Sequence, residues 1–325
     1  MTVLITGGAG YIGSHMAWRF VDTGRRFVVL DNLTTGFIKA VPPGIELVQA
    51  NVGERETVRK IIRDHRIDSV IHFAGSVVVP ESVRDPISYY HNNTAASLAL
   101  ISACVDEGVD KLIFSSTAAV YGGDHTFGVA EDTPKAPESP YGRSKLMTET
   151  MLSDIASATN LRHAVLRYFN VAGADPKGRA GQSTRRATHL IKIACEVAVG
   201  KRDRLAIYGG DYNTPDGTCI RDYIHVTDLV DAHALALDAL EHYAGGLTLN
   251  CGYGVGYSVK EVISAVENVS GKKLNVVMDN RRAGDAPALV ADPSNLKNTL
   301  PWSPKFQNLE EIVAHVLAWE MSASY

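Results

Sequence analysis

Short apolar runs alternate with amphipathic stretches through the first half of the chain. The apolar runs predict buried strands, which we expect at residues 3–5, 27–30, 46–50, 69–74, 111–116 and 164–168. Apolar positions at helical spacing predict helices, which we expect at residues 11–23, 54–66, about 89–107 and from 140 onward. Alternating strands and helices are typical of a parallel sheet with helices on both faces. We therefore expect an α/β fold built on a doubly wound parallel sheet.

The alternation fades after about residue 170. The later pattern predicts helices at residues 187–199, 226–244, 259–269 and 309–319, and strands at 248–250 and 274–277. Short strands and turns are expected between residues 205 and 223, and polar loops at 177–186 and 280–285. We expect a first domain at residues 1–170 and a smaller mixed α/β domain at 171–325. Some segments of the second domain should return to the first.

Three glycines separate the first predicted strand from the first predicted helix. Gly7 permits a tight turn, Gly10 lets the backbone approach a diphosphate, and Gly13 lets the helix pack close to the strand. The helix N-terminus then presents free N–H groups to the anion. Asp31 ends the second strand, where it would bind the ribose hydroxyls of NAD and repel the extra phosphate of NADP. This order of elements predicts a Rossmann domain that binds NAD.

A second group of candidate residues begins at Ser139, which can cap a helix whose first turn contains Pro140. Tyr141 and Lys145 then lie four residues apart on one helical face. A free tyrosine has a pKa of about 10, which a neighbouring lysine and a positively charged nicotinamide would lower. Thr117, at the end of the preceding strand, would share the proton of the substrate. These residues predict a site that takes a proton from an alcohol while hydride leaves for NAD.

Composition excludes several classes of protein. The 325 residues carry a net charge of −4 with acids and bases mixed, which does not favour binding to nucleic acid. No apolar run is long enough to span a membrane, and we expect no secretory signal. The eleven histidines lack metal-ligand spacing, so no metal site is predicted. The scattered cysteines are expected to be reduced thiols of a cytoplasmic protein: Cys104, Cys195, Cys219 and Cys251.

With these residues laid out, nearly the whole chain resembles the extended short-chain dehydrogenase/reductase family, and within it the nucleotide-sugar 4-epimerases. Besides the glycine turn, the motifs that carry the resemblance are 31–33, 73–75, 115–117, 120–122, 139–142, 167–170, 216–218, 221–226 and 281–285. The middle and late motifs are more specific than the glycines, because they belong to the sugar-nucleotide end of the site.

The resemblance implies an activity and roles for its residues. Tyr141 would be the catalytic base, Lys145 would lower its pKa and hold the nicotinamide ribose, and Thr117 would bind the sugar O4. The implied reaction interconverts UDP-galactose and UDP-glucose through a 4-keto sugar, with tightly bound NAD. Such enzymes are usually homodimers, which we expect here by resemblance alone.

The expected binding residues form two sets. The NAD site would comprise Gly7, Gly10, Tyr11, Ile12, Gly13, Asp31, Asn32, Leu33, Thr34, Thr35, Gly36, Asn51, Val52, Phe73, Ala74, Gly75, Asn92, Ser115, Tyr141, Lys145, Tyr168 and Phe169. The UDP-sugar site would comprise Thr117, Tyr141, Asn170, His189, Leu190, Ala206, Tyr208, Arg221, Arg282, Asp285 and Leu289. The arginines of the second set, Arg221 and Arg282, suit a diphosphate because a guanidinium group can donate two parallel hydrogen bonds to phosphate oxygens.

Four positions depart from the family pattern. Val77 stands where a lysine is frequent, and Asn51 replaces an aspartate, which should weaken an adenine contact. His189 stands where an asparagine commonly contacts the diphosphate. At Leu289, a tyrosine would exclude N-acetylated sugars and a cysteine or serine would admit them. Leucine is intermediate, so acceptance of UDP-GlcNAc stays open.

Rival functions remain beside the leading one. A nucleotide-sugar 4,6-dehydratase would carry an Asp-Glu pair after Thr117, but Ala118 and Ala119 follow it here. A 4-epimerase acting on UDP-GlcNAc, UDP-xylose or UDP-glucuronate stays open, as does a non-catalytic NAD-binding regulator. Arg185 and Arg186 could contact phosphate, but a solvated basic loop is the favoured interpretation.

Overall fold

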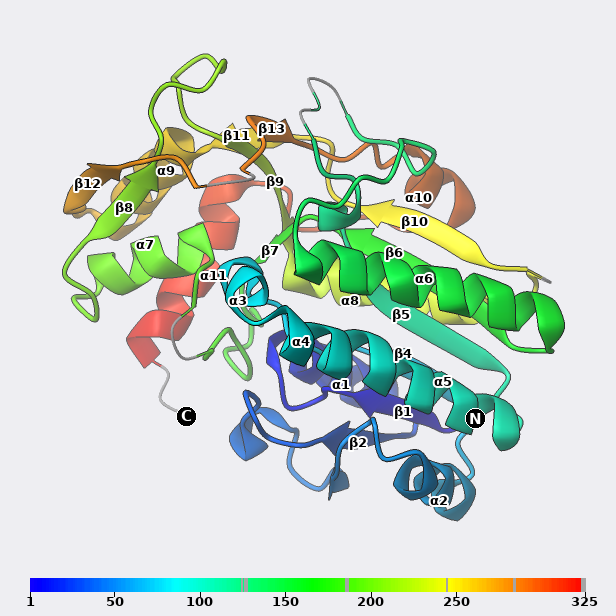
Figure 1. The fold of residues 1–325 in the computed structure, drawn as a ribbon. Helices are drawn as coiled ribbons and strands as arrows, with labels where there is room; N and C mark the ends of the chain where they lie inside the picture. Colours follow the sequence, from blue (N-terminus) through cyan, green and yellow to red (C-terminus); the bar gives the residue numbers. More distant parts are fainter. Residues whose placement is uncertain (124, 126–127, 185–186, 244, 283–284, 323–325) are drawn as a thin grey trace.

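The computed structural model describes residues 1–123, 125, 128–184, 187–243, 245–282 and 285–322 (Figure 1). Its centre is a seven-stranded sheet in the order β10-β6-β5-β4-β1-β2-β3 with every pairing parallel. The strands are β1 (Val3–Thr6), β2 (Phe27–Asp31), β3 (Leu47–Gln49), β4 (Ser69–His72), β5 (Lys111–Thr117), β6 (Arg162–Tyr168) and β10 (Leu247–Cys251). The doubly wound parallel sheet that the alternation predicts is therefore confirmed.

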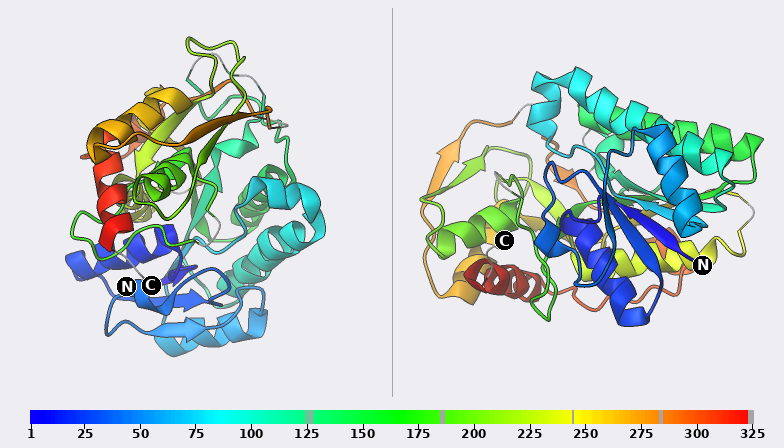
Figure 2. Two further views of the ribbon diagram at one scale, coloured as in Figure 1. Left: turned by 90° about the vertical axis from the view of Figure 1, so that its left-hand side faces the viewer. Right: turned by 90° about the horizontal axis from the view of Figure 1, so that it is seen from below.

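Helices cover both faces of this sheet (Figures 1 and 2). One face packs against α1 (Tyr11–Thr23) and α8 (Val226–Ala239), and the other against α2 (Arg55–His65), α5 (Ala96–Asp106) and α6 (Pro140–Ala158). Neighbouring residues of a strand point to opposite faces, so Leu4 and Ile5 belong to two different apolar cores. Burial on both sides explains why these strands are continuous apolar runs.

Shorter elements form the rest of the molecule. One small sheet contains β7 (Asn170–Ala172), β9 (Ile220–His225), β11 (Gly256–Ser258) and β13 (Ala288–Leu289). A second pairs β8 (Leu205–Tyr208) with β12 (Val276–Asp279). Beside them lie α7 (Leu190–Ala198), α9 (Val259–Ser270), α10 (Ser294–Thr299) and α11 (Leu309–Ser322). Helices α7, α9 and α11 pack on one another, and their buried side chains belong to the same core as those of α1 and α8.

The first-half elements match their predicted ranges closely, and the differences have local causes. The single helix expected over residues 89–107 is divided into α4 (Pro86–Tyr89), a π-helical turn η2 (Tyr90–Ala95) and α5. A short helix, α3 (Val79–Arg84), precedes it and was not predicted. Within the π-turn the Asn93 side chain bonds to the loop at Ser76, a contact that apolar periodicity does not reveal.

Element boundaries differ most in the second half. Helix α7 begins at Leu190 rather than at residue 187, and α8 ends at Ala239 rather than at 244. Strand β12 begins at Val276, two residues later than predicted. Among the described helices, none combines the length and apolarity that a membrane span requires.

Candidate active site

The glycine turn lies at the carboxyl end of β1, where close backbone packing excludes side chains. Gly7 has φ +70°, and a Cβ there would lie 2.6 Å from the Ala74 backbone nitrogen. A Cβ on Gly13 would lie 2.2 Å from the Gly7 carbonyl oxygen. Gly10 caps α1 and no side chain bonds to that end, so the first N–H groups of the helix are available to an anion. The turn therefore has the geometry that the glycine spacing predicts.

Asp31 holds this turn together from the carboxyl end of β2. Its Oδ2 accepts a hydrogen bond from the Ala9 N–H at 2.9 Å, and its Oδ1 accepts one from the Leu33 N–H at 2.8 Å. Burial raises the pKa of the Asp31 carboxyl, and these two N–H donors act against that rise. A carboxylate has about four acceptor positions. Asp31 therefore keeps capacity for two ribose hydroxyls while it also positions the loop.

The turn after β4 lies between the glycine turn and α6, the catalytic helix, which carries Tyr141 and Lys145. A Cβ on Gly75 would lie 3.0 Å from Asn93 Oδ1 and 3.6 Å from Lys145 Nζ. Asn93 Oδ1 accepts from the Ser76 N–H at 2.7 Å, and its Nδ2 donates to the Ser76 carbonyl and to Ser144 Oγ, both at 3.0 Å. Asn93 is fully buried, and sequence reasoning selected its neighbour Asn92 instead.

The three predicted catalytic residues meet where β5 ends and α6 begins. The Ser139 hydroxyl caps α6 by accepting from the Gly142 N–H at 3.2 Å, as the sequence predicts. Tyr141, only 6% exposed, is hydrogen-bonded through its side chain to Thr117. This pair can exchange a proton with an alcohol placed beside it.

Lys145 approaches the same point from one helical turn further along α6. Its Nζ donates to the Ser115 carbonyl oxygen at 3.1 Å and lies 4.9 Å from the centre of the Phe114 ring. Only 3% of Lys145 is exposed. Burial lowers the pKa of its ammonium to about 8, although the Glu149 carboxylate raises it. Lys145 therefore titrates close to neutral pH.

The pKa of Tyr141 differs from the sequence expectation. Burial raises it to about 12 in the protein alone, and the hydrogen bond from Thr117 only partly offsets this effect. The sequence expectation included the positive charges of Lys145 and of a bound nicotinamide but not the loss of water around the phenol. The protein by itself therefore holds Tyr141 as a neutral phenol at pH 7.

The residues expected at the nucleotide end gather on the small sheets. Arg221 on β9 lies 3.5 Å from an Asp285 oxygen through its Nη2 atom. The Arg282 guanidinium carbon lies 3.7 Å from the centre of the Tyr208 ring. Tyr208 and Ala206 are half-buried on one side of β8, while Leu205 and Ile207 are buried on the other. This arrangement provides two cations and a ring for a nucleoside diphosphate.

Leu289 occupies a place between the two ends. It pairs with Arg221 across β9 and β13, and it packs half-buried against the cluster that contains Phe169 and Ala118. Ala118 directly follows Thr117 in the chain. A side chain at position 289 can therefore affect what fits beside Thr117.

The remaining predicted residues are placed as follows. Ser115 directs its hydroxyl to His233 Nε2 at 2.9 Å, so its side chain faces α8. His189 precedes α7 without a side-chain bond to the helix end and bonds instead to Gln182, and burial lowers the pKa of its imidazole. Asn92 donates to Ser76 Oγ at 2.8 Å.

Other predicted residues shape or line the loops at this edge. Those in the segments after β2, β3 and β4 are Asn32, Thr34, Thr35, Gly36, Asn51, Val52 and Phe73, whereas Tyr11 and Ile12 begin α1, Tyr168 ends β6, Asn170 begins β7 and Leu190 begins α7. Arg185, Arg186 and Gly284 lie outside the described residues. The described residues contain no group of three or more His, Cys, Asp or Glu side chains that could hold a metal ion.

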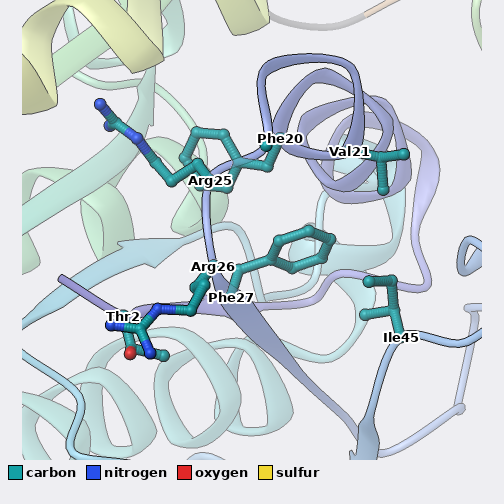
Figure 3. Close-up of a pocket in the computed structure, with 8 residues that line it drawn as sticks. Thr2, Phe20, Val21, Arg25, Arg26, Phe27 and Ile45 are labelled. Atoms are coloured by element: carbon teal, nitrogen blue, oxygen red, sulfur yellow. The ribbon is translucent and has the colours of Figure 1, made fainter.

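Two hollows differ in their relation to this edge. One of about 460 Å³ lies between the end of α1 and the start of β2, among Phe20, Val21, Arg26 and Ile45 (Figure 3). It is at the amino end of the strands, whereas ligands of such sheets bind at the carboxyl end. A much smaller hollow of about 10 Å³ lies over the glycine turn, where the segment 181–184 faces Gly10 and Tyr11. The second hollow lies at the carboxyl end, but its volume is about that of a single water, so it does not itself accommodate a diphosphate.

These observations fit a bound dinucleotide. At Gly7, Gly10 and Gly13 a Cβ would press on neighbouring backbone, at Gly10 3.2 Å from the Gly7 carbonyl oxygen, so the turn keeps its tight form only with glycine. The uncapped start of α1 and the carboxylate of Asp31 supply the donors and acceptors that phosphate and ribose require. Lys145 lies at the far end of the same edge, beside Gly75.

Comparisons with known proteins agree with this geometry. A family model described as the NAD dependent epimerase/dehydratase family matches residues 3–252. A UDP-glucose 4-epimerase of Azospirillum brasilense is 54% identical over 320 residues, covering 98% of this chain and 92% of that protein.

Solved structures are also similar over their full length. That of UDP-glucose 4-epimerase from Brucella ovis in complex with NAD is 42% identical, with a TM-score of 0.94 and coverage of 98% of this chain and 97% of that one. The UDP-Glc/GlcNAc 4-epimerase from Campylobacter jejuni is 45% identical, with a TM-score of 0.86 and coverage of 99% of both chains.

The close approach at Gly7 can be tested by substitution. We expect Gly7→Ala to abolish dinucleotide binding, because the new methyl group would separate the turns after β1 and β4. Gly24→Ala is the matched control: Gly24 has a similar φ of +66°, but a Cβ there would meet no atom of the described chain within 4 Å. Dinucleotide released by acid from each purified variant is measured by chromatography. Equal dinucleotide content in the two variants would contradict this role for Gly7.

Proposed function

The chain belongs to the NAD dependent epimerase/dehydratase family, and we propose that it interconverts UDP-galactose and UDP-glucose by oxidation and reduction at the sugar C4. The observation that carries this proposal is the meeting of Thr117, Tyr141 and Lys145 beside the turn at Gly75. This constellation can move a proton at a sugar hydroxyl next to the place where the dinucleotide fits.

The residues of the chain have separate tasks in this reaction. Tyr141 takes the proton from the sugar O4 and returns it, while Thr117 holds the O4 hydroxyl through its own side chain. Lys145, protonated below its pKa of about 8, stabilises the Tyr141 phenolate. NAD held at the glycine turn and Asp31 would supply reversible hydride transfer at C4, so that no net oxidation would result. Burial of all three side chains keeps water from the 4-keto sugar.

An epimerase must also hold the nucleotide while the sugar turns over. We assign this task to Arg221, Arg282 and Asp285, with Tyr208 beneath the Arg282 guanidinium. Binding energy far from the reacting carbon can keep the UDP in place without restraining the sugar. In this proposal the seven-stranded sheet holds NAD, and the small sheets hold UDP.

The dehydratase alternative lacks its carboxylates. Directly after Thr117 comes the short helix η3 (Ala118–Val120), whose first two residues are alanines. A regulator without activity would not need Tyr141 buried in contact with Thr117, nor Lys145 buried against the end of the same strand at Ser115.

Removal of the Tyr141 hydroxyl tests the reaction. We expect Tyr141→Phe to bind NAD but to convert UDP-galactose at about one hundredth of the wild-type rate or less, because the general base is lost. The control is Tyr243→Phe, which changes an exposed tyrosine. Proton NMR of the sugar, without added reductant, follows the conversion. Undiminished turnover in Tyr141→Phe would remove this residue from the proposed role.

Acceptance of N-acetylated sugars forms a second proposal, supported by the position of Leu289 and by the bifunctional name of the C. jejuni relative. We expect Leu289→Tyr to reduce conversion of UDP-GalNAc about tenfold or more relative to UDP-galactose, because the larger ring would fill space near Ala118. Leu289→Ser should change the same ratio in the opposite direction. Parallel assays with both sugars measure it, and equal losses on the two sugars would contradict the proposal.

We also propose a homodimer that uses the outer surfaces of the neighbouring helices α5 and α6 (Figure 1). Leu98 on α5 is 43% exposed, and Met147 on α6 is 45% exposed. Alanines 95 and 99 lie beside Leu98 and would allow close helix packing. All four cysteines are buried and unpaired, which suits the reducing cytoplasm that we propose as the location.

The proposed dimer surface can be tested by placing charged side chains on it. We expect the double variant Leu98→Arg with Met147→Arg to halve the mass in light scattering, because two cations would be buried between the subunits. Met278→Arg is the control, since Met278 is 59% exposed on β12 in another part of the molecule. A wild-type monomer, or an unchanged mass in the double variant, would rule out this surface.

A further inference from the structure

A buried ion pair lies directly behind the catalytic residues. Glu149 on α6 and Arg167 on β6 are 7% and 4% exposed. The Arg167 Nη2 atom lies 2.6 Å from Glu149 Oε2, and its Nε donates to both carboxylate oxygens at 3.1 and 3.2 Å. This is the paired geometry in which an arginine fork binds a carboxylate most strongly.

The same carboxylate reaches the catalytic strand. Ser116 donates its hydroxyl to Glu149 Oε1, and Ser116 stands between Ser115, which accepts from Lys145, and Thr117, which contacts Tyr141. In the parallel register of β5 and β6, Ser116 is paired with Arg167. Glu149 therefore connects the end of β5, the strand β6 and the catalytic helix at one point.

A polar network fixes Arg167 from its other side. Its Nη1 donates to the Tyr121 hydroxyl at 2.9 Å and to the Glu131 carbonyl at 3.2 Å. The Tyr121 hydroxyl in turn donates to Asn250 Oδ1 at 2.7 Å. Tyr121 and Asn250 are fully buried. Because every member has a partner, this network can hold the pair in one geometry.

Glu149 also acts on Lys145 through charge. The two residues are four apart on α6, and the Glu149 carboxylate raises the pKa of Lys145 against the effect of burial. Among the described residues, His72 on β4 also interacts with Lys145, and Tyr168 on β6 and Tyr89 interact with Tyr141. The Tyr89 hydroxyl in turn bonds to Glu81 of α3. Burial lowers the pKa of His72 to about 3, so His72 is neutral.

We propose that Glu149, held by Arg167, is a positioning residue that keeps Lys145 charged and keeps the Ser115–Thr117 strand end against the catalytic helix. It touches neither the cofactor nor the substrate. The expected effect on turnover rests on the proposed epimerase function, whereas the effect on the charge of Lys145 does not.

The sign of the effect follows from Coulomb's law. Removal of a negative charge near the Lys145 ammonium makes protonation less favourable, so its pKa falls below about 8. Since Lys145 stabilises the phenolate only when it is protonated, the loss of turnover at high pH should begin at a lower pH.

The experiment compares Glu149→Gln with wild type. We expect the alkaline limb of the kcat profile for UDP-galactose to move by about one pH unit toward lower pH. The titration of Lys145 itself is followed by carbon NMR on protein labelled at lysine Cε, with Lys145→Arg used to identify the signal. The midpoint of that titration should fall by a similar amount, whether or not the protein is active on UDP-galactose.

Two controls separate charge from stability. Glu320→Gln removes a carboxylate of similar burial, 5% exposed against 7% for Glu149, which bonds to Lys192 at 2.5 Å on another helix, α11. It should lower the melting temperature without moving either pH midpoint. Glu149→Asp keeps the charge, so the Lys145 midpoint should stay close to that of wild type. Because the aspartate side chain is shorter and reaches its partners less well, kcat should still fall.

Each outcome decides the proposal. If Glu149→Gln does not fold, Glu149→Asp and Arg167→Lys still test it, because both keep every charge and should leave the Lys145 midpoint unchanged. An unaltered Lys145 midpoint in folded Glu149→Gln, or a shifted one in Glu149→Asp, would overturn the proposal. Wild-type protein without activity on UDP-galactose, but with the expected NMR shift, would instead contradict the proposed function.

Discussion

The parallel register of β1, β4 and β5 is the constraint on which the site depends. It brings the turn at Gly7, the turn at Gly75 and the end of β5 to one edge, where the Gly7 backbone lies against the Ala74 backbone and Gly75 lies against the Asn93 and Lys145 side chains. The missing Cβ atoms let the strand ends come this close. The predicted cofactor residues, although distant in the sequence, therefore share one surface with Lys145.

Burial controls the electrostatics of this surface. Tyr141 and Lys145 lose water, and burial makes the charged form of each less favourable: the pKa of Tyr141 rises to about 12 and that of Lys145 falls to about 8. Specific neighbours act against these shifts: the Thr117 hydroxyl lowers the pKa of the Tyr141 phenol, and the Glu149 carboxylate raises the pKa of the Lys145 ammonium. The positive charge of the nicotinamide ring would add to the first of these influences.

The nucleotide end is built differently from the cofactor end. Its residues come from short strands whose partners are far apart in sequence, such as β13 beside β9 and β12 beside β8. The small cluster of Leu289, Phe169 and Ala118 joins that end to the catalytic strand. Leu289, for which we propose an influence on the choice of sugar, therefore packs in the same cluster as the residue that follows Thr117.

Local spacing and periodicity were enough to predict most elements of the first half, though not α3 or the division of the helix before α5, and also the glycine turn, Asp31, and the order of Thr117, Tyr141 and Lys145. The resemblance supplied the candidate nucleotide residues. The Asn93 contacts, the Glu149–Arg167 pair and the pairing of the short strands became visible only in the folded chain. The same is true of the raised pKa of Tyr141. Those features depend on burial and on contacts between distant residues, which one-dimensional patterns do not contain.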